Sequence, residues 1–158
     1  FPMITSVSEV QKVLEICKTV REELQAEQIP YAEKIELGIM IETPAAAIIS
    51  DQLAPLVDFF SVGTNDLTQY TLACDRQNPD IESFCDTHHE AILRLIAWSA
   101  KNAHEHGAWI GICGELAADT SLTERFLRMG IDELSVSPTF VLKVRDAVRK
   151  VDLRTKEN

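Results

Sequence analysis

The sequence predicts an α/β fold of the (β/α)8 TIM-barrel type, of which these 158 residues hold about the C-terminal half, strands five to eight with their helices. Short apolar runs alternate strictly with helical patterns, which is typical of a parallel sheet covered by helices. Polar residues follow each apolar run, where barrels place their chemistry. Neither a Gly-rich dinucleotide fingerprint nor a P-loop sequence is present, which favours a barrel over a doubly wound sheet. A whole barrel needs about 250 residues.

The first elements are predicted from capping residues and helical spacing. Phe1–Ile4 is expected to be the end of a strand. Ser6 is a suitable N-cap for a long amphipathic helix, whose apolar residues recur at helical spacing: Val10, Val13, Leu14, Cys17, Val20 and Leu24. Residues 35–41 then predict a strand that ends at Glu42, and Pro44 opens the next helix.

The remaining elements follow the same alternation. Strands are predicted over residues 58–62, 109–113 and 133–136, and helices begin behind the polar corner at 64–66 and span residues 89–106, 120–129 and 139–151. Residues 71–87 read as a polar connection. Because right-handed crossovers bring the C-terminal ends of parallel strands to one face, the polar residues that follow these strands are expected to meet there.

Composition limits the classes of function. Hydrophobic residues make up 46% of the chain, enough for a folded domain with its own core. No apolar run reaches the roughly 18 residues of a membrane span, so membrane insertion is not expected. The net charge of −10 argues against nucleic-acid binding, which needs a basic face. The four cysteines form no CxxC pair, and we predict free thiols in a reducing cytoplasm: Cys17, Cys74, Cys85 and Cys113.

Two carboxylates are the leading candidates for a metal site. Glu42 and Asp66 follow adjacent predicted strands at the same level. Two carboxylates that face one opening repel each other unless a cation or a shared proton stabilises them. Hard divalent cations accept such oxygens, and Mg²⁺ typically keeps waters and substrate phosphate oxygens besides. The alternative is that each carboxylate only caps the helix that follows it.

Asn65 and Arg76 are the candidates for binding an anionic substrate. Asn65 adds a neutral donor beside Asp66, and Arg76 follows the polar corner from which it could clamp a phosphate or carboxylate. A surface ion pair of Arg76 with Asp75 or Glu82 is the competing interpretation, and the sequence alone favours it.

Cys113 is the candidate for acid or nucleophilic chemistry. It ends a predicted strand between Gly111 and Gly114, whose small size lets a ligand approach closely. Acidic neighbours are expected to keep the thiol protonated, which favours an acid over a nucleophile. The histidines lie away from the strand ends and are not expected to be catalytic: His88, His89, His104 and His106.

Three stretches in the same order carry a resemblance to a known family. They are GIMIETPAA (38–46), DFFSVGTNDLTQY (58–70) and GICGEL (111–116). The chain resembles the phosphoenolpyruvate-utilising enzymes over nearly its whole length, and among them most closely the Enzyme I (phosphoenolpyruvate–protein phosphotransferase) branch of the bacterial sugar phosphotransferase system. The stretch TLACDR (71–76) looks more like that branch than like pyruvate phosphate dikinase or phosphoenolpyruvate synthase, which remain the alternative.

The resemblance implies a role for each candidate residue. It implies that Glu42 and Asp66 bind Mg²⁺ (or Mn²⁺), that Asn65, Asp66 and Arg76 hold phosphoenolpyruvate, and that Cys113 donates a proton to enolpyruvate to give pyruvate. It also implies a cytoplasmic homodimer that passes the phosphoryl group through a histidine on another domain to the carrier protein HPr.

The chain also departs from the family pattern. The phosphohistidine and HPr-binding domains are absent from residues 1–158, as are the first barrel strands with two further arginines, and His88-His89 replaces the usual His-Pro. We therefore expect this chain alone to be unable to phosphorylate HPr. A truncated barrel that only self-associates through its open edge is the non-catalytic alternative.

Overall fold

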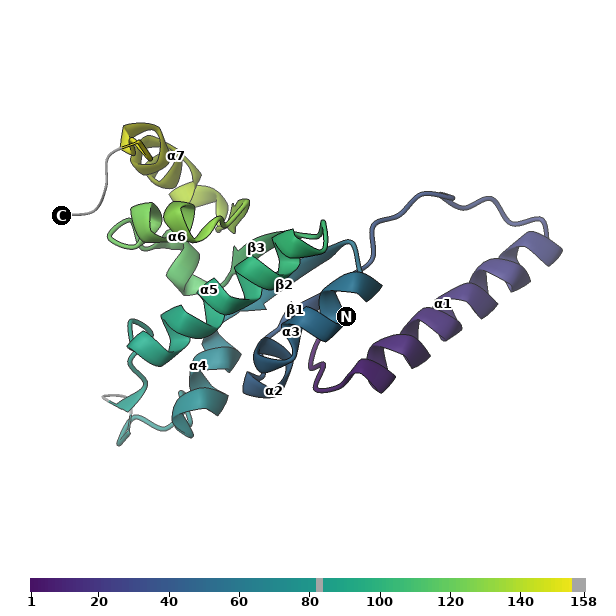
Figure 1. Cartoon of the computed structure of the whole chain (residues 1–158), viewed down its shortest axis with the longest axis horizontal. Coiled ribbons are helices and arrows are strands. Elements are labelled where there is room, and N and C mark those ends of the chain that lie inside the picture. The colour runs from purple at the N-terminus through teal and green to yellow at the C-terminus, as the bar shows by residue number, and fades with distance from the viewer. Residues whose placement is uncertain (82–83, 155–158) are drawn as a thin grey trace.

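A computed structural model describes residues 1–81 and 84–154. Its four-stranded sheet is parallel throughout, with the strands in chain order β1-β2-β3-β4 (Figure 1). The strands are β1 (Gly38–Ile41), β2 (Phe59–Gly63), β3 (Trp109–Cys113) and β4 (Glu133–Ser135). The α-helices are α1 (Val7–Ala26), α2 (Pro44–Ile48), α3 (Ser50–Leu53), α4 (Thr64–Leu72), α5 (Glu90–Glu105), α6 (Thr123–Met129) and α7 (Val141–Lys150). The predicted α/β fold and its parallel sheet are confirmed.

Residues 1–4, predicted to be the end of a strand, are not assigned as a strand, but their backbone bonds to β1. The Phe1 amino group donates to the Gly38 carbonyl at 2.7 Å, and the Met40 N–H donates to the Phe1 carbonyl at 2.8 Å. The first residues therefore lie alongside β1 and extend its hydrogen bonding beyond the four strands.

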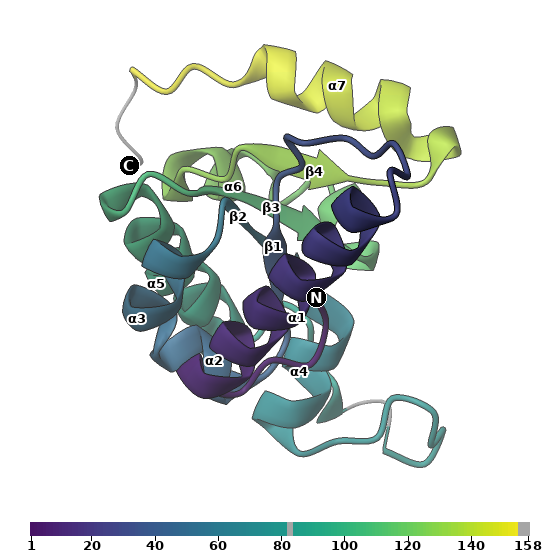
Figure 2. The same cartoon turned by 90° about the vertical axis from the view of Figure 1, so that its right-hand side faces the viewer.

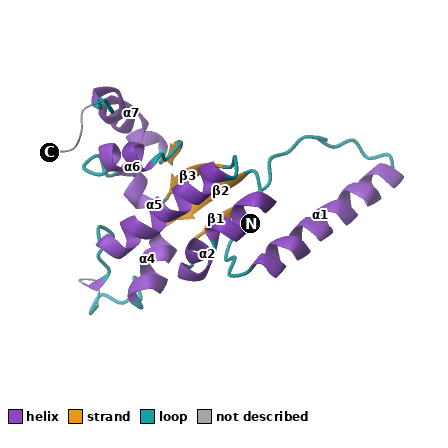
Figure 3. Ribbon diagram, viewed as in Figure 1, coloured by secondary structure: helices purple, strands orange, loops and turns teal. Residues whose placement is uncertain are grey.

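The two faces of the sheet have different surroundings. Alternate residues of the first three strands are buried on the face that α2, α3 and α5 cover (Figures 2 and 3): Ile39, Ile41, Phe60, Val62, Ile110 and Ile112. The opposite face carries the partly buried ring pair Phe59–Trp109, stacked with centroids 4.5 Å apart. Since side chains alternate along a strand, Ser61 and Cys113 also belong to this second face.

Helix α1 begins as predicted but is poorly buried. The Ser6 hydroxyl accepts from the Glu9 N–H, and the Glu9 carboxylate accepts from the Ser6 N–H, which together form a capping box. Val10 is the one buried residue of α1, and Val20 is 45% exposed. Figure 1 shows α1 projecting from the body, so the described elements leave its outer apolar residues uncovered.

Several predicted boundaries shift. β1 starts at Gly38 rather than at residue 35, and α4 continues to Leu72, two residues into the predicted connection. Helix α6 starts at Thr123 rather than at residue 120, because the 3-10 turn η3 (Glu115–Ala118) and the turn after it come first. The last strand ends at Ser135, and a 3-10 turn, η4 (Pro138–Phe140), precedes α7.

The prediction that all four cysteines are free is wrong for two of them. Cys74 and Cys85 form a disulfide with a Cα–Cα distance of 5.9 Å, while Cys17 and Cys113 are free. The connection after α4 turns back on itself and brings the two sulfurs together. The spacing of the two cysteines, 11 positions apart, does not predict this turn.

A search of the described residues for a helix long and apolar enough to cross a membrane finds none.

Phe60 provides a test of the core. Its side chain is fully buried under the helices, whereas Phe84 is 71% exposed. We expect Phe60→Ala to lower the free energy of unfolding by about 3–5 kcal/mol, because it leaves a cavity in a packed core. Phe84→Ala removes the same group from the surface and should change it by less than about 0.5 kcal/mol. Denaturant unfolding measures both, and equal losses would contradict this assignment of the core.

Candidate functional site

The ends of the strands are aligned in one layer. Gly63 of β2 pairs with Cys113 of β3, and Cys113 pairs with Ser135 of β4. Ile41 pairs with Val62, so Glu42 follows at the level of Gly63. The expected meeting of the strand ends is therefore confirmed by the parallel register.

Glu42 is buried in this layer, with only 3% of the residue exposed. Its Oε1 accepts from the Met3 N–H at 2.6 Å, which fixes one carboxylate oxygen. A Cβ at Gly63 would lie 2.7 Å from Glu42 Oε2 and 2.9 Å from its Cβ. A side chain at position 63 would therefore displace the carboxylate, and glycine there keeps the space that Glu42 occupies.

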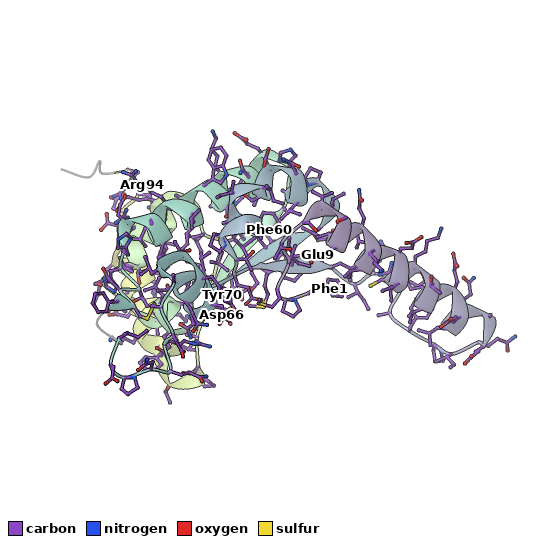
Figure 4. All side chains as sticks on the ribbon, turned by 90° about the horizontal axis from the view of Figure 1, so that it is seen from below. Phe1, Glu9, Phe60, Asp66, Tyr70 and Arg94 are labelled. Carbon is purple, nitrogen blue, oxygen red and sulfur yellow. A yellow bond between two sulfur atoms is a disulfide. The ribbon has the colours of Figure 1, made fainter. Side chains whose placement is uncertain are left out.

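Asp66 lies in the first turn of α4, close to Tyr70 one turn later (Figure 4). The N-cap of α4 is Gly63, and no side chain caps the helix, so Asp66 is not the helix cap. Its Oδ1 lies 3.4 Å from Arg76 Nη2. The Arg76 side chain is 44% exposed and the Asp66 side chain 34% exposed. Solvent therefore screens the attraction between them, and a ligand can reach both groups.

Arg76 is held from two sides. Besides its contact with Asp66, its N–H donates to Gln69 Oε1 at 3.3 Å. Among the described residues its ion-pair partner is Asp66 and not Asp75, which instead accepts from the Gln77 N–H. The alternative partner Glu82 lies outside the described residues.

The Cys113 thiol lies between two groups of β2. Its sulfur donates to the Val62 carbonyl at 3.3 Å and accepts from the Ser61 hydroxyl at 3.4 Å. The Thr64 hydroxyl donates to the Cys113 carbonyl at 3.3 Å. Sequence reasoning missed both hydroxyls. Ser61 could have been found from strand alternation, since it precedes Gly63 by two positions and shares its face.

Gly114 completes the turn behind Cys113. Its φ of +110° lies in the region that favours glycine, and a Cβ there would lie 2.8 Å from Thr64 Oγ1. A larger residue would push β3 away from the start of α4.

Two adjoining cavities open at the strand ends, and Asn65 and Glu115 line both. The larger, about 760 Å³, lies over the sheet between β3 and η4: Asn65, Cys113, Gly114, Glu115, Ala118, Ser135, Val136, Ser137 and Phe140. The smaller, about 280 Å³, lies beside Arg76: Asn65, Thr68, Arg76, Cys85, Thr87 and Glu115. Of these two cavities, Cys113 lines the larger and Arg76 the smaller, and Asn65 lines both. Glu42 and Asp66 line neither cavity.

His88 and Asp119 connect two segments next to the smaller cavity. His88 Nε2 lies 2.8 Å from Asp119 Oδ2. Hydrogen bonds from the hydroxyl and N–H of Ser121, together with the His88 ring, hold the pKa of Asp119 below its usual value. The contact links the segment before α5 to the segment that follows η3.

Comparison with known proteins identifies the family. The model of the family described as "PEP-utilising enzyme, PEP-binding domain" matches residues 1–153. The chain belongs to this family. The resemblance found in its three motifs is thereby confirmed at the level of the family.

Similar proteins carry one name. The chain is 45% identical over 157 residues to the phosphoenolpyruvate-protein phosphotransferase of Lactococcus lactis subsp. cremoris, covering 99% of this chain and 27% of that protein. It is 44% identical over 151 residues to the protein of that name from Priestia megaterium, covering 96% of this chain and 26% of that protein. The chain thus spans about a quarter of the length of these relatives.

A solved structure supports the fold. A citrate lyase from Burkholderia xenovorans LB400 superposes with a TM-score of 0.70 at 19% identity, covering 94% of this chain and 47% of that chain. This likeness concerns the fold alone. A match to about half of a larger chain agrees with the predicted half barrel.

The lowered pKa of Asp119 predicts a pH dependence of stability. Because the folded-state pKa lies below that of the unfolded chain, the ionised carboxylate stabilises the fold above about pH 4. That contribution is lost as the pH falls through the folded-state pKa. We expect Asp119→Asn to be less stable than wild type at pH 6 and the difference to shrink by pH 3, measured by denaturant unfolding. A difference that stays constant over this range would contradict the role of the ionised carboxylate.

Proposed function

We propose that this chain is the phosphoenolpyruvate-binding part of a phosphoenolpyruvate–protein phosphotransferase, in which it releases pyruvate as the phosphoryl group passes to a histidine on another domain. One observation carries the proposal. Asn65 and Arg76, which the family resemblance assigns to the substrate, line the smaller cavity at the strand ends, and Asn65 also lines the larger cavity together with Cys113, to which the resemblance assigns proton transfer. The names of the similar proteins favour this enzyme over a dikinase or synthase.

The substrate is a small dianion or trianion, and the opening offers donors suited to it. The Arg76 guanidinium presents planar N–H groups that match a phosphate or a carboxylate. In the free protein it is paired only loosely with Asp66, at 3.4 Å, so substrate binding does not have to break a tight ion pair. The Asn65 side chain lines both cavities and adds an uncharged donor between Arg76 and Cys113.

Proton transfer is assigned to Cys113. When the phosphorus–oxygen bond of phosphoenolpyruvate breaks, the electron pair remains on enolpyruvate, whose methylene carbon then takes a proton to give pyruvate. Cys113 Sγ is the donor, and the Ser61 hydroxyl, 3.4 Å away, stabilises the thiolate left behind. The small residues Gly111 and Gly114 on either side leave space for the methylene carbon to approach.

Glu42 and Asp66 are the proposed metal ligands. The described residues contain no cluster of three or more His, Cys, Asp or Glu side chains that could hold a metal. A pair of carboxylates nevertheless suits Mg²⁺ or Mn²⁺, which fill their remaining positions with water and substrate phosphate oxygens. Such an ion, when bound, neutralises charge on the transferring phosphoryl group.

The partners and the cellular setting follow from the same assignment. We propose that the whole protein phosphorylates HPr for sugar uptake, that it is a homodimer, and that it acts in the cytoplasm. The formal net charge of −10 on this chain does not exclude a small anionic substrate, because Arg76 supplies a local positive charge beside the smaller cavity.

Calorimetric titration tests substrate binding. We expect phosphoenolpyruvate to bind the chain in the presence of Mg²⁺, and Asp66→Ala to weaken binding at least about tenfold, since charge-assisted contacts are lost. Asp51→Ala, which removes an exposed carboxylate of α3, is the matched control and should leave the Kd unchanged. Equal affinities for the three proteins, or no binding by folded wild type with Mg²⁺, would contradict the proposed site.

Pyruvate release tests the role of Cys113. With the histidine domain of such a phosphotransferase supplied as acceptor, Cys113→Ala should slow pyruvate formation roughly hundredfold, the usual contribution of a general acid. Its Kd for phosphoenolpyruvate should stay within about twofold, because the thiol is not assigned to binding. Cys17→Ala, on α1, is the control. Unchanged pyruvate formation by Cys113→Ala would refute the assignment.

A further inference from the structure

The connection between α4 and α5 forms a wall of the smaller cavity. Helix α4 ends at Leu72, and its C-cap residue Ala73, with a φ of +52°, turns the chain out of the helix. Arg76, Cys85 and Thr87 of this connection then line the cavity beside Asn65 and Glu115. The position of this segment therefore decides where the Arg76 guanidinium stands.

Few hydrogen bonds fasten this wall to the rest of the molecule. The hydrogen bonds described for residues 77–81 and 84–87 all have their partners within residues 75–89. Arg76 N–H reaches Gln69 of α4, and the His88 ring reaches Asp119. The Arg76 guanidinium also contacts Asp66 of α4 at 3.4 Å, and the Cys74–Cys85 disulfide joins Cys85 covalently to the end of α4.

Cys74 is fixed at the end of α4, and Cys85 lines the smaller cavity. Cys74 is only 4% exposed, and its N–H donates to the Gln69 carbonyl at 3.1 Å, so it belongs to the end of α4. Cys85 lines the cavity and is partly exposed. A reagent can therefore reach the disulfide at Cys85 from the cavity, while Cys74 joins the segment to the buried end of α4.

We propose that Cys74 and Cys85 are a reversible thiol–disulfide pair, whose oxidised state fixes the wall that carries Arg76 and whose reduced state releases it. We propose that this protein acts in the cytoplasm, which is a reducing compartment. Disulfides in such a compartment are typically transient and redox-sensing. The partial exposure of Cys85 at a ligand cavity fits a pair that is exchanged rather than one buried for stability.

The exchange balances with a dithiol reductant of the thioredoxin class. One reductant thiolate attacks Cys85 Sγ, the Cys74–Cys85 bond breaks, and Cys74 Sγ leaves and takes a proton. The second reductant thiol then attacks the mixed disulfide and releases Cys85, which is protonated in turn. Two electrons pass to the pair, and the reductant becomes a disulfide. Oxidation by a disulfide of the same class runs the sequence backwards.

One consequence rests on the proposed function. If the opening binds phosphoenolpyruvate, the oxidised chain presents Arg76 already in place, and the reduced chain must order the wall on binding. We expect reduction to weaken binding roughly three- to tenfold, as for the loss of a preorganised loop.

Equilibration of the chain with glutathione buffers tests the pair directly, without any substrate. Alkylation followed by mass spectrometry should count two reactive thiols, Cys17 and Cys113, in the oxidised chain and four in the reduced chain. Amide hydrogen exchange in peptides from Arg76 to Ile81 and from Phe84 to Thr87 should be at least about tenfold faster after reduction, while α5 is unchanged.

Two variants separate the pair from general effects of the redox buffer. Cys85→Ser should exchange like the reduced chain in every buffer, whereas Cys17→Ser, which alters an unpaired thiol on α1, should still respond like wild type. A pair that stays reduced in every oxidising buffer, or amide exchange that does not depend on its state, would overturn the inference. Absence of phosphoenolpyruvate binding in both states would count against the proposed function alone, because the alkylation and exchange results still decide the inference.

Discussion

The parallel register of β2 with β3 is the constraint on which the site depends. By pairing Gly63 with Cys113 it brings the end of one strand level with the end of the next. The same ladder places Glu42 beside Gly63 and Ser135 beside Cys113. Backbone hydrogen bonds therefore set the positions of groups from segments as far apart in the sequence as Glu42 and Ser135, and no side chain has to hold that alignment by itself.

Small residues at the strand ends leave space for the side chains that the alignment brings together. Gly63 leaves the volume that the buried Glu42 carboxylate fills, and Gly114 allows the turn that brings Thr64 against the end of β3. Ser61, two positions before Gly63 on β2, contacts the Cys113 sulfur. The face of the sheet that carries these groups is the less buried one, so the packed face under α2, α3 and α5 supplies rigidity and the other face carries the proposed site.

The part of the proposed site around Arg76 is built differently from the strand ends. Arg76 belongs to a long connection that is joined to the body by a few hydrogen bonds, an ion contact and a disulfide. Such segments reorganise at lower cost than strands. On our proposal, the affinity of the site can therefore change through the segment that carries Arg76, without any change in the sheet that positions Cys113.

The sequence by itself determined the order of strands and helices, because apolar periodicity and helix-start residues such as Ser6 and Pro44 act locally. It also determined the family, since three motifs of contiguous residues carry that information. The tertiary structure alone decided that Asp66 meets Arg76, that Ser61 touches Cys113, and that Cys74 joins Cys85. These contacts depend on how a connection folds back or how two strands register, which no local pattern encodes. The outer part of α1 illustrates the same limit, because its helical spacing predicted an apolar face but not what would cover it.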